Sequence, residues 1–208
     1  MQIDYIFSLA ILIMSVVIHE VSHGFMAYAL GDKTAKYQGR LTLNPIYHLD
    51  LFGSILLPLF LALTGAGFII GWAKPVPYNP YNLRNQRWGE ALVAFAGPLS
   101  NIILAFVFGL VIRLGSGILP PSFLELSFTL VLINIVLACF NLVPIPPLDG
   151  SKILFSVIPN SLGSLRSILE QYGLVLGLMF VFFFWESLDP VVFTIAQWFT
   201  GIPVASLM

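Results

Sequence analysis

Hydrophobic residues in this 208-residue chain form long runs that are separated by short polar stretches. A helix of about 17–25 apolar residues is long enough to cross the hydrocarbon layer of a membrane. The runs predict about four to five membrane-spanning helices, of which the clearest cover about residues 4–30, 88–114, 123–144 and 169–185. The pattern thus predicts an all-α polytopic membrane protein.

One further apolar run, Leu51–Trp72, is interrupted by glycine and proline at positions 53, 58, 65, 67 and 71. We expect it to enter the membrane and turn back as a re-entrant segment, because non-helical backbone is tolerated there where it lines a cavity. Eight of the nine cations then share one side, as the positive-inside tendency requires. They are Lys33, Lys36, Arg40, Lys74, Arg84, Arg87, Lys152 and Arg166, with Arg113 opposite.

Three shorter features complete the expected architecture. Tyr, Thr and Leu around Gly39 predict a small β-hairpin over Lys36–Leu43. A short interfacial helix is expected near Gly150–Ile158, and the tail Pro190–Met208 is expected along the interface or against the bundle. We therefore expect one membrane-embedded domain over residues 1–208, with a catalytic core at about 4–158 and C-terminal helices over 159–208.

Composition agrees with this architecture. Hydrophobic residues make up 58% of the chain and charged residues 9%, against about 25% charged in an ordinary soluble domain. Mean hydropathy is +0.94. A net charge of −1 gives no case for a nucleic-acid partner. Cys139 is the only cysteine, so no disulfide can form within the chain.

The chemistry is concentrated in the first apolar run, at His19-Glu-Val-Ser-His23. Two histidines four positions apart project from one face of a helix and can hold one Zn²⁺. Glu20 lies one step round the helix, where it can take a proton from a water molecule at the metal. The alternative is a pair of buried histidines bonded to backbone carbonyls, but three ionisable groups in a membrane helix are costly and by default functional.

A catalytic zinc site needs a third protein ligand. Asp149 is the best choice, because it ends an apolar run in a proline-rich, bent stretch, and a re-entrant Leu51–Trp72 brings it to the histidine side. From the residues alone Asp149 could equally cap the helix that starts at Gly150.

Three motifs together resemble the site-2 protease family of intramembrane zinc metalloproteases. They are His19-Glu-Val-Ser-His23, Gly97-Pro-Leu-Ser-Asn101 and Asn141-Leu-Val-Pro-Ile-Pro-Pro-Leu-Asp149-Gly150, and the similarity covers most of residues 5–155. The chain looks like the compact subgroup without a PDZ domain. The resemblance implies that His19, His23 and Asp149 bind one zinc ion, that Glu20 is the acid/base, and that Asn141 helps to stabilise the oxyanion.

The resemblance also implies single-span membrane proteins as substrates and cleavage in or near their transmembrane helices. We expect a multi-pass protein of a prokaryotic cell membrane, with its active site near the cytoplasmic side. The sequence does not define the roles of two possible accessory residues. Asn101 belongs to the second motif, and His48 is a further ligand, a gate, or a loop histidine that is hydrogen-bonded at the membrane surface.

Two rival functions use the same residues. A metal transporter would also place His and Asp in a membrane, but it would space its ligands along a path and has no use for Glu20. A membrane metal-binding protein without proteolytic activity could use the same pocket to hold helices or lipids.

Overall fold

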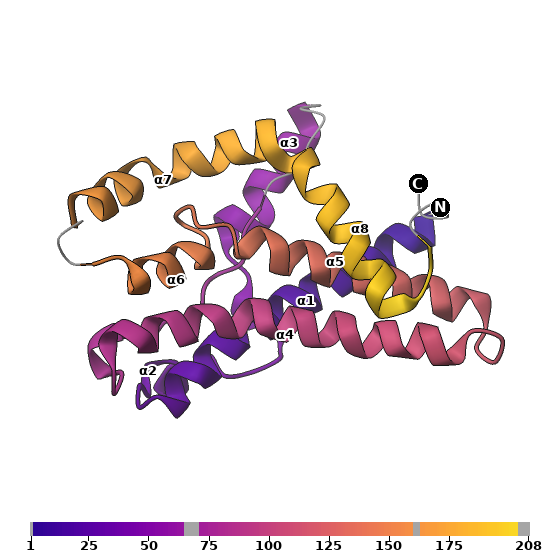
Figure 1. Ribbon diagram of the computed structural model, residues 1–208, viewed down its shortest axis with the longest axis horizontal. Helices are drawn as coiled ribbons and strands as arrows, with labels where there is room; N and C mark the ends of the chain where they lie inside the picture. The colour runs from indigo at the N-terminus through magenta and orange to yellow at the C-terminus, as the bar shows by residue number, and fades with distance from the viewer. Residues whose placement is uncertain (1, 65–70, 160–162, 204–208) are drawn as a thin grey trace.

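The computed structural model describes residues 2–64, 71–159 and 163–203. Its frame is a set of long helices that run side by side: α1 (Gln2–Ala29), α4 (Gln86–Gly115) and α5 (Pro121–Asn141) (Figure 1). A shorter helix, α8 (Asp189–Thr200), packs against α4 and α5. Ala105, Val131, Ile135 and Ala196 are buried where these last three helices meet.

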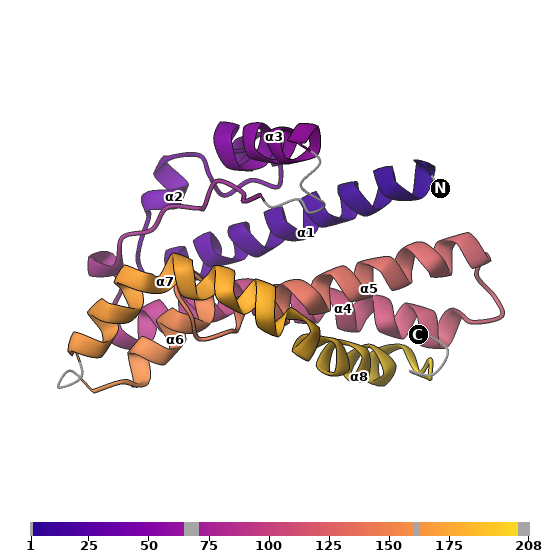
Figure 2. The same cartoon turned by 90° about the horizontal axis from the view of Figure 1, so that it is seen from above.

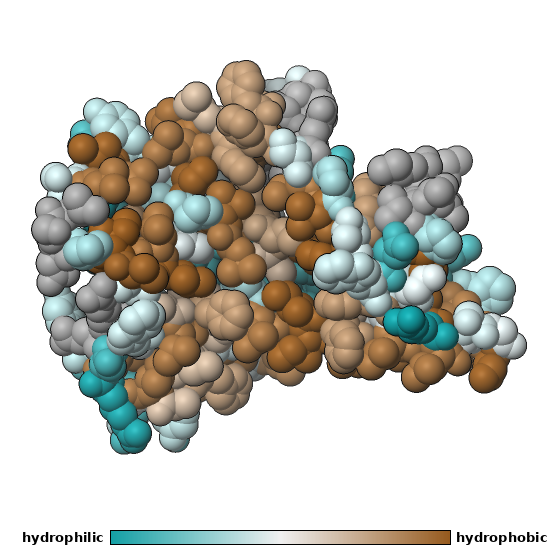
Figure 3. All heavy atoms as spheres, viewed as in Figure 1, coloured by the Kyte–Doolittle hydropathy of each residue, from teal (hydrophilic) through white to brown (hydrophobic). Residues whose placement is uncertain are grey.

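Four helices in the described part of the chain are long and apolar enough to cross a membrane, which confirms the predicted spans. They are Ile6–Ala29, Trp88–Gly115, Pro121–Asn141 and Gly163–Phe184. Helix α7 (Gly163–Phe184) begins earlier than predicted, and its polar first turns include an ion pair between Arg166 and Glu170 at 2.8 Å. The face drawn in Figure 3 is mostly hydrophobic, with hydrophilic residues gathered toward its two ends, as a chain surrounded by lipid requires.

The two described ends of the Leu51–Trp72 segment lie together, which agrees with the predicted re-entrance. The segment enters through a π-helical stretch (Leu51–Leu56) and helix α3 (Leu57–Thr64), while residues 65–70 lie outside the described residues. Its two ends are joined, because the Trp72 N–H donates to the Gly53 carbonyl (3.2 Å) and the Ser54 hydroxyl donates to the Trp72 carbonyl (2.8 Å). A segment that leaves where it entered does not cross the bilayer.

The predicted β-hairpin over Lys36–Leu43 is wrong. Residues Thr34–Tyr37 form a short helix, α2, and residues 38–43 contain no strand. The backbone N–H groups of Gln38, Gly39 and Arg40 donate back to carbonyls of residues 34–36. These local bonds use the donors that a partner strand would need.

The ends of several distant segments lie together at one end of the bundle (Figure 1). Figure 1 places the C-terminal end of α1, helix α2, the start of α4 and helix α6 (Asp149–Val157) at one end of the bundle, and Figure 2 shows the same grouping from above. Arg113 lies in the last turn of α4, at the opposite end. The tail forms α8 and packs against the bundle, which is one of the two predicted alternatives.

Candidate metal centre

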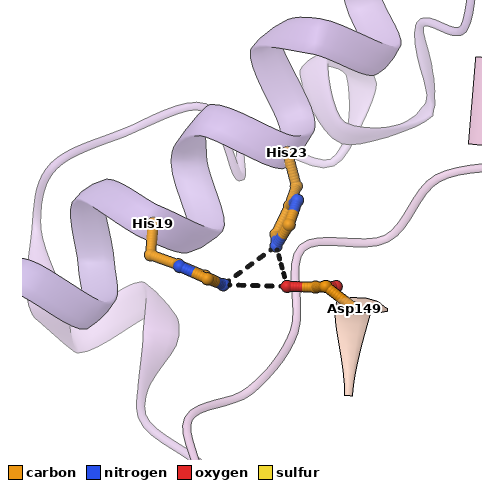
Figure 4. A group of neighbouring side chains, drawn as sticks. All are labelled: His19, His23 and Asp149. Atoms are coloured by element: carbon orange, nitrogen blue, oxygen red, sulfur yellow. Dashed lines mark hydrogen bonds and ion pairs between the residues drawn. The ribbon is translucent and has the colours of Figure 1, made fainter. Parts of the chain in front are cut away.

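Three side chains from two distant parts of the chain meet at one point (Figure 4). His19 Nε2 and His23 Nε2 each lie 3.1 Å from Asp149 Oδ2, and the two nitrogens lie 3.0 Å apart. The three residues are only 5–8% exposed. They form the one group of at least three His, Cys, Asp or Glu side chains, among the residues described, whose ligand atoms could hold a metal ion.

The other nitrogen of each ring defines its tautomer. His19 Nδ1 lies 2.6 Å from Asn101 Oδ1, and His23 Nδ1 lies 2.6 Å from the Val93 carbonyl oxygen. Both oxygens can only accept, so each Nδ1 donates its proton. In a neutral ring each Nε2 therefore presents a lone pair toward Asp149, which is how neutral histidines ligate metals.

Two imidazole lone pairs and a carboxylate oxygen at about 3 Å need a cation, or at least a proton, between them. The donor set fits zinc, which takes His nitrogen and carboxylate oxygen at about 2.0–2.2 Å, so that tetrahedral ligand atoms lie roughly 3.3 Å apart. The observed separations of 3.0–3.1 Å are close to that value. Three protein ligands would leave one of the four positions of a zinc ion for water or substrate, as in catalytic zinc sites.

A buried network of hydrogen bonds across three helices supports His19. Asn101 Nδ2 on α4 donates to Asn134 Oδ1 on α5 (2.8 Å), and Asn134 Nδ2 donates to the Ser15 hydroxyl on α1 (2.9 Å). Both asparagines are 0% exposed. Since Asn101 Nδ2 faces oxygen acceptors, its Oδ1 must face the histidine, which fixes the ring orientation.

Gly97 brings the backbone of α4 close to the histidines. A Cβ at this position would lie 2.5 Å from His23 Nε2 and 2.6 Å from His19 Nε2. Any side chain would therefore occupy the space of the ligand atoms, which explains the glycine of the Gly97-Pro-Leu-Ser-Asn101 motif.

The bend between α5 and α6 places Asp149 beside the two histidines. Asp149 occupies the first turn of α6, whose N-cap is Leu148, and no side chain caps that helix, so the capping alternative is not what the structure forms. Gly150 packs directly on the Leu142 carbonyl, where a Cβ would collide. Lys152 Nζ lies 3.7 Å from the second oxygen, Oδ1.

The charge state of Asp149 suits a metal ligand. Burial alone would raise the pKa of its carboxyl, but hydrogen bonding with the two imidazoles and the nearby Lys152 charge outweigh burial and hold the pKa well below its usual range. The carboxylate is therefore ionised at neutral pH. A proton on either Nε2 provides that hydrogen bond in the absence of metal, and a zinc ion would take its place.

Glu20 lies beside this group without joining it. Its side chain is partly buried, and Oε2 accepts a hydrogen bond of 2.9 Å from the backbone N–H of Val76. The extended chain after Trp72 thus reaches the carboxylate for which the sequence motif predicts the acid/base role.

The structure brings Asn101 to the metal centre but neither Asn141 nor His48. The Asn141 amide donates to the Leu137 carbonyl on its own helix (2.9 Å). His48 Nε2 donates to the Thr42 carbonyl (2.8 Å), and its own carbonyl accepts from Lys74 (2.8 Å). Among the described contacts, neither side chain touches the three ligand candidates, and the environment of His48 matches the loop-histidine alternative.

Sequence reasoning missed Asn134, Ser15 as its partner, and Val76. Asn134 carried a usable signal, because an amide inside an otherwise apolar membrane helix needs a partner in the bundle. Val76 carried none, since its contribution is a backbone N–H.

Comparisons with known proteins identify the family. The family model described as peptidase family M50 matches residues 7–121 and 117–184. "Putative zinc metalloprotease YwhC" of Bacillus subtilis is 43% identical over 81% of this chain and 76% of the relative. "Putative zinc metalloprotease MJ0611" of Methanocaldococcus jannaschii is 35% identical over 71% of this chain and 72% of the relative.

A third relative, "Putative zinc metalloprotease Rip2" of Mycolicibacterium smegmatis, is 33% identical over 66% of this chain and 52% of the relative. No solved structure matches the chain. Since the family model covers most of the chain and the first relative matches over three quarters of both lengths, this multi-pass membrane protein belongs to peptidase family M50, the site-2 protease family of zinc metalloproteases.

Proposed function

We propose that this protein is an intramembrane zinc metalloprotease that hydrolyses peptide bonds in or near the transmembrane helices of single-span membrane proteins. The observation that carries the proposal is the meeting of His19 Nε2, His23 Nε2 and Asp149 Oδ2 within 3.1 Å of one another, with Glu20 next to the first ligand. The zinc metalloprotease names of the relatives support the same activity.

The proposed division of labour follows from the side chains. His19, His23 and Asp149 would hold one zinc ion, which when bound supplies a Lewis acid that polarises the scissile carbonyl and makes water more acidic. Glu20 takes the proton of the attacking water and passes it to the leaving amine. Asn141 would donate to the oxyanion, for which its amide must leave the Leu137 carbonyl.

The position of the metal site in the membrane determines which peptide bonds can reach it. The three ligand candidates lie toward the end of the bundle that carries most cations, so we place the site near the cytoplasmic face of a prokaryotic cell membrane. Water reaches the site from that face. A peptide bond inside a helix is shielded, and a substrate helix must therefore unwind locally before cleavage.

The test is cleavage of a tagged single-span membrane protein co-expressed with wild type, Glu20→Ala or Asp149→Ala. Glu125→Ala is the matched control, because Glu125 is an exposed carboxylate in the first turns of α5, far along the chain from the site. Proteolysis predicts cleavage by wild type and Glu125→Ala and loss of cleavage in the other two variants. Equal cleavage in all four would overturn the proposal, and metal flux into liposomes that survives Glu20→Ala would favour a transporter.

A further inference from the structure

The extended chain between α3 and α4 crosses α1 at Glu20 with a single available backbone donor. The sequence here is Lys74-Pro75-Val76-Pro77, and proline has no N–H. Val76 is therefore the one residue of positions 75–77 that can donate, and its N–H bonds to Glu20 Oε2 at 2.9 Å. The Val76 side chain is 5% exposed, so this bond is held by packing.

A buried arginine holds this extended chain in place. Arg40 is 7% exposed, and its Nη2 donates to the carbonyls of Lys74 (2.9 Å) and Pro75 (3.2 Å), the two residues that precede Val76. Arg40 has no acidic partner among the described residues, and its Nε is buried without a hydrogen bond. Burying a guanidinium in this way is costly, and the groups that it orders are the carbonyls next to the Val76 amide.

Packing at Gly24 also holds the extended chain of residues 74–77 against α1. A Cβ at Gly24 would lie 2.6 Å from the Leu41 side chain and 2.7 Å from the Val76 side chain. Glycine at this position lets both segments lie directly on α1, one helical turn beyond Glu20. The Lys74 N–H, which donates to the His48 carbonyl at 2.8 Å, anchors the other edge of the segment.

We propose that the Val76 amide positions the Glu20 carboxylate for proton transfer, and that Arg40 is a positioning residue that acts through Val76. One carboxylate oxygen is held by the amide, which leaves Oε1 to exchange protons with water and the leaving amine. This inference rests on the proposed acid/base role of Glu20. It assigns a functional reason to the Pro-Val-Pro sequence and to the buried Arg40.

The first experiment compares Val76→Pro with Val76→Ala in the purified, zinc-loaded, full-length protein. Val76→Pro removes the N–H, whereas Val76→Ala keeps the N–H and removes side-chain packing. Because a small misplacement of a catalytic group can cost about 10²-fold in rate, we expect kcat of Val76→Pro to fall by roughly that factor, with KM and zinc content close to those of Val76→Ala. Equal kcat in the two variants would overturn the inference.

Arg40 is tested by rescue. Arg40→Gln should lower kcat without loss of zinc, and Arg40→Lys should restore part of it, because lysine keeps a cationic donor but lacks the planar guanidinium. Lys33→Gln is the matched control, since Lys33 is an exposed cation on the same side of the bundle. Loss of zinc and of folded protein in Arg40→Gln, in proportion to the loss of activity, would reduce Arg40 to a purely structural role.

The second experiment does not depend on activity. Hydrogen exchange of a peptide cut from Lys74 to Pro77 reports the Val76 amide alone, because its N-terminal amine at Lys74 does not retain label and the two prolines carry no exchangeable amide. Glu20→Ala and Arg40→Gln should each speed exchange of that amide in zinc-free and zinc-loaded protein, whereas Lys33→Gln should not. An exchange rate that Glu20→Ala leaves unchanged would overturn the inference.

The proposed protease function and the positioning role of Val76 can be disproved independently of each other. If Glu20→Ala cleaves substrate as wild type does, the proposed function fails, while the exchange result still reports the hydrogen bond. If wild type cleaves, Glu20→Ala does not, and Val76→Pro matches Val76→Ala, then only the positioning inference fails.

Discussion

His19 and Asp149 are separated by 130 positions in the chain, yet His19 Nε2 lies 3.1 Å from Asp149 Oδ2. The first belongs to α1 and the second to α6, so the metal centre exists only when the two ends of the core are packed together. A metal that binds both residues would therefore stabilise the folded bundle as well as supply chemistry.

Gly97→Ala should reduce zinc binding, because the added Cβ would lie 2.5–2.6 Å from the histidine nitrogens that face Asp149. We expect a clear loss of bound zinc after purification, measured by elemental analysis. Gly163→Ala is the matched control, since a Cβ there meets no atom within 4 Å. Full zinc content in Gly97→Ala would show that the ring positions differ from those described.

Asn134→Leu should weaken zinc binding although Asn134 touches none of the three ligand candidates. Its loss removes the shorter of the two hydrogen bonds that orient Asn101 toward His19, and leaves the 3.4 Å bond to the Ser15 carbonyl. Substitutions of groups that orient metal ligands typically cost about 10–100-fold in metal affinity, and we expect a loss in that range from competition with a zinc chelator.

Thr129→Val is the control for that experiment, because the Thr129 hydroxyl donates to the Glu125 carbonyl on its own helix and to no other described residue. Asn101→Leu should weaken zinc binding at least as much as Asn134→Leu, and the double variant should be no worse than Asn101→Leu alone. Independent, additive losses would argue against a relay from Asn134 through Asn101.

The main spans and the metal motif could be predicted from sequence because both are local patterns. The length of an apolar run and the four-residue spacing of His19 and His23 are set by helix geometry, which does not depend on the rest of the fold. Re-entrance of Leu51–Trp72 followed from its glycines and from the side on which the cations fall. The Gly53–Trp72 hydrogen bond agrees with that expectation.

What could not be predicted depends on packing between distant segments. The partner of Asn134 and the donor to Glu20 are determined by how α5 and residues 74–77 lie against α1. The hairpin prediction failed for a related reason. Strand-forming residue types around Gly39 were outweighed by the turn that follows Asp32, which satisfies the backbone locally.

Asp32 should make the turn after α1 sensitive to acid. Burial alone would raise the pKa of its carboxyl, but hydrogen bonds from Thr34, Asn82 and the Asn79 N–H outweigh burial, so the pKa lies below its ordinary value of 3.8. A lowered pKa means that the ionised carboxylate stabilises the fold above pH ~4, the ordinary carboxyl value, and that this stabilisation is lost as the pH falls through the folded pKa.

Asp32→Asn should therefore lower the thermal midpoint at pH 7, by an amount that corresponds to about 1–3 kcal/mol for a hydrogen-bonded charge. The difference from wild type should shrink below about pH 4. Thermal unfolding in detergent at a series of pH values measures it. A difference that grows in acid would contradict the sign of this argument.

The topology predicts that residues on either side of the re-entrant segment face the same compartment. In a Cys139→Ala background, single cysteines at Lys33 and Lys74 should react with an impermeant maleimide from one side of sealed vesicles. A cysteine at Ser116, in the connection between α4 and α5, should react from the other side. Opposite reactivity at positions 33 and 74 would mean that Leu51–Trp72 crosses the membrane.

The most direct measurement of the central claim is the zinc content of purified protein by elemental analysis, for wild type, His23→Ala, Asp149→Ala and Glu20→Ala. A site built from His19, His23 and Asp149 predicts one zinc per chain in wild type and in Glu20→Ala, and little or none in His23→Ala and Asp149→Ala. Equal zinc content in all four proteins, or none in wild type supplied with zinc, would contradict the account.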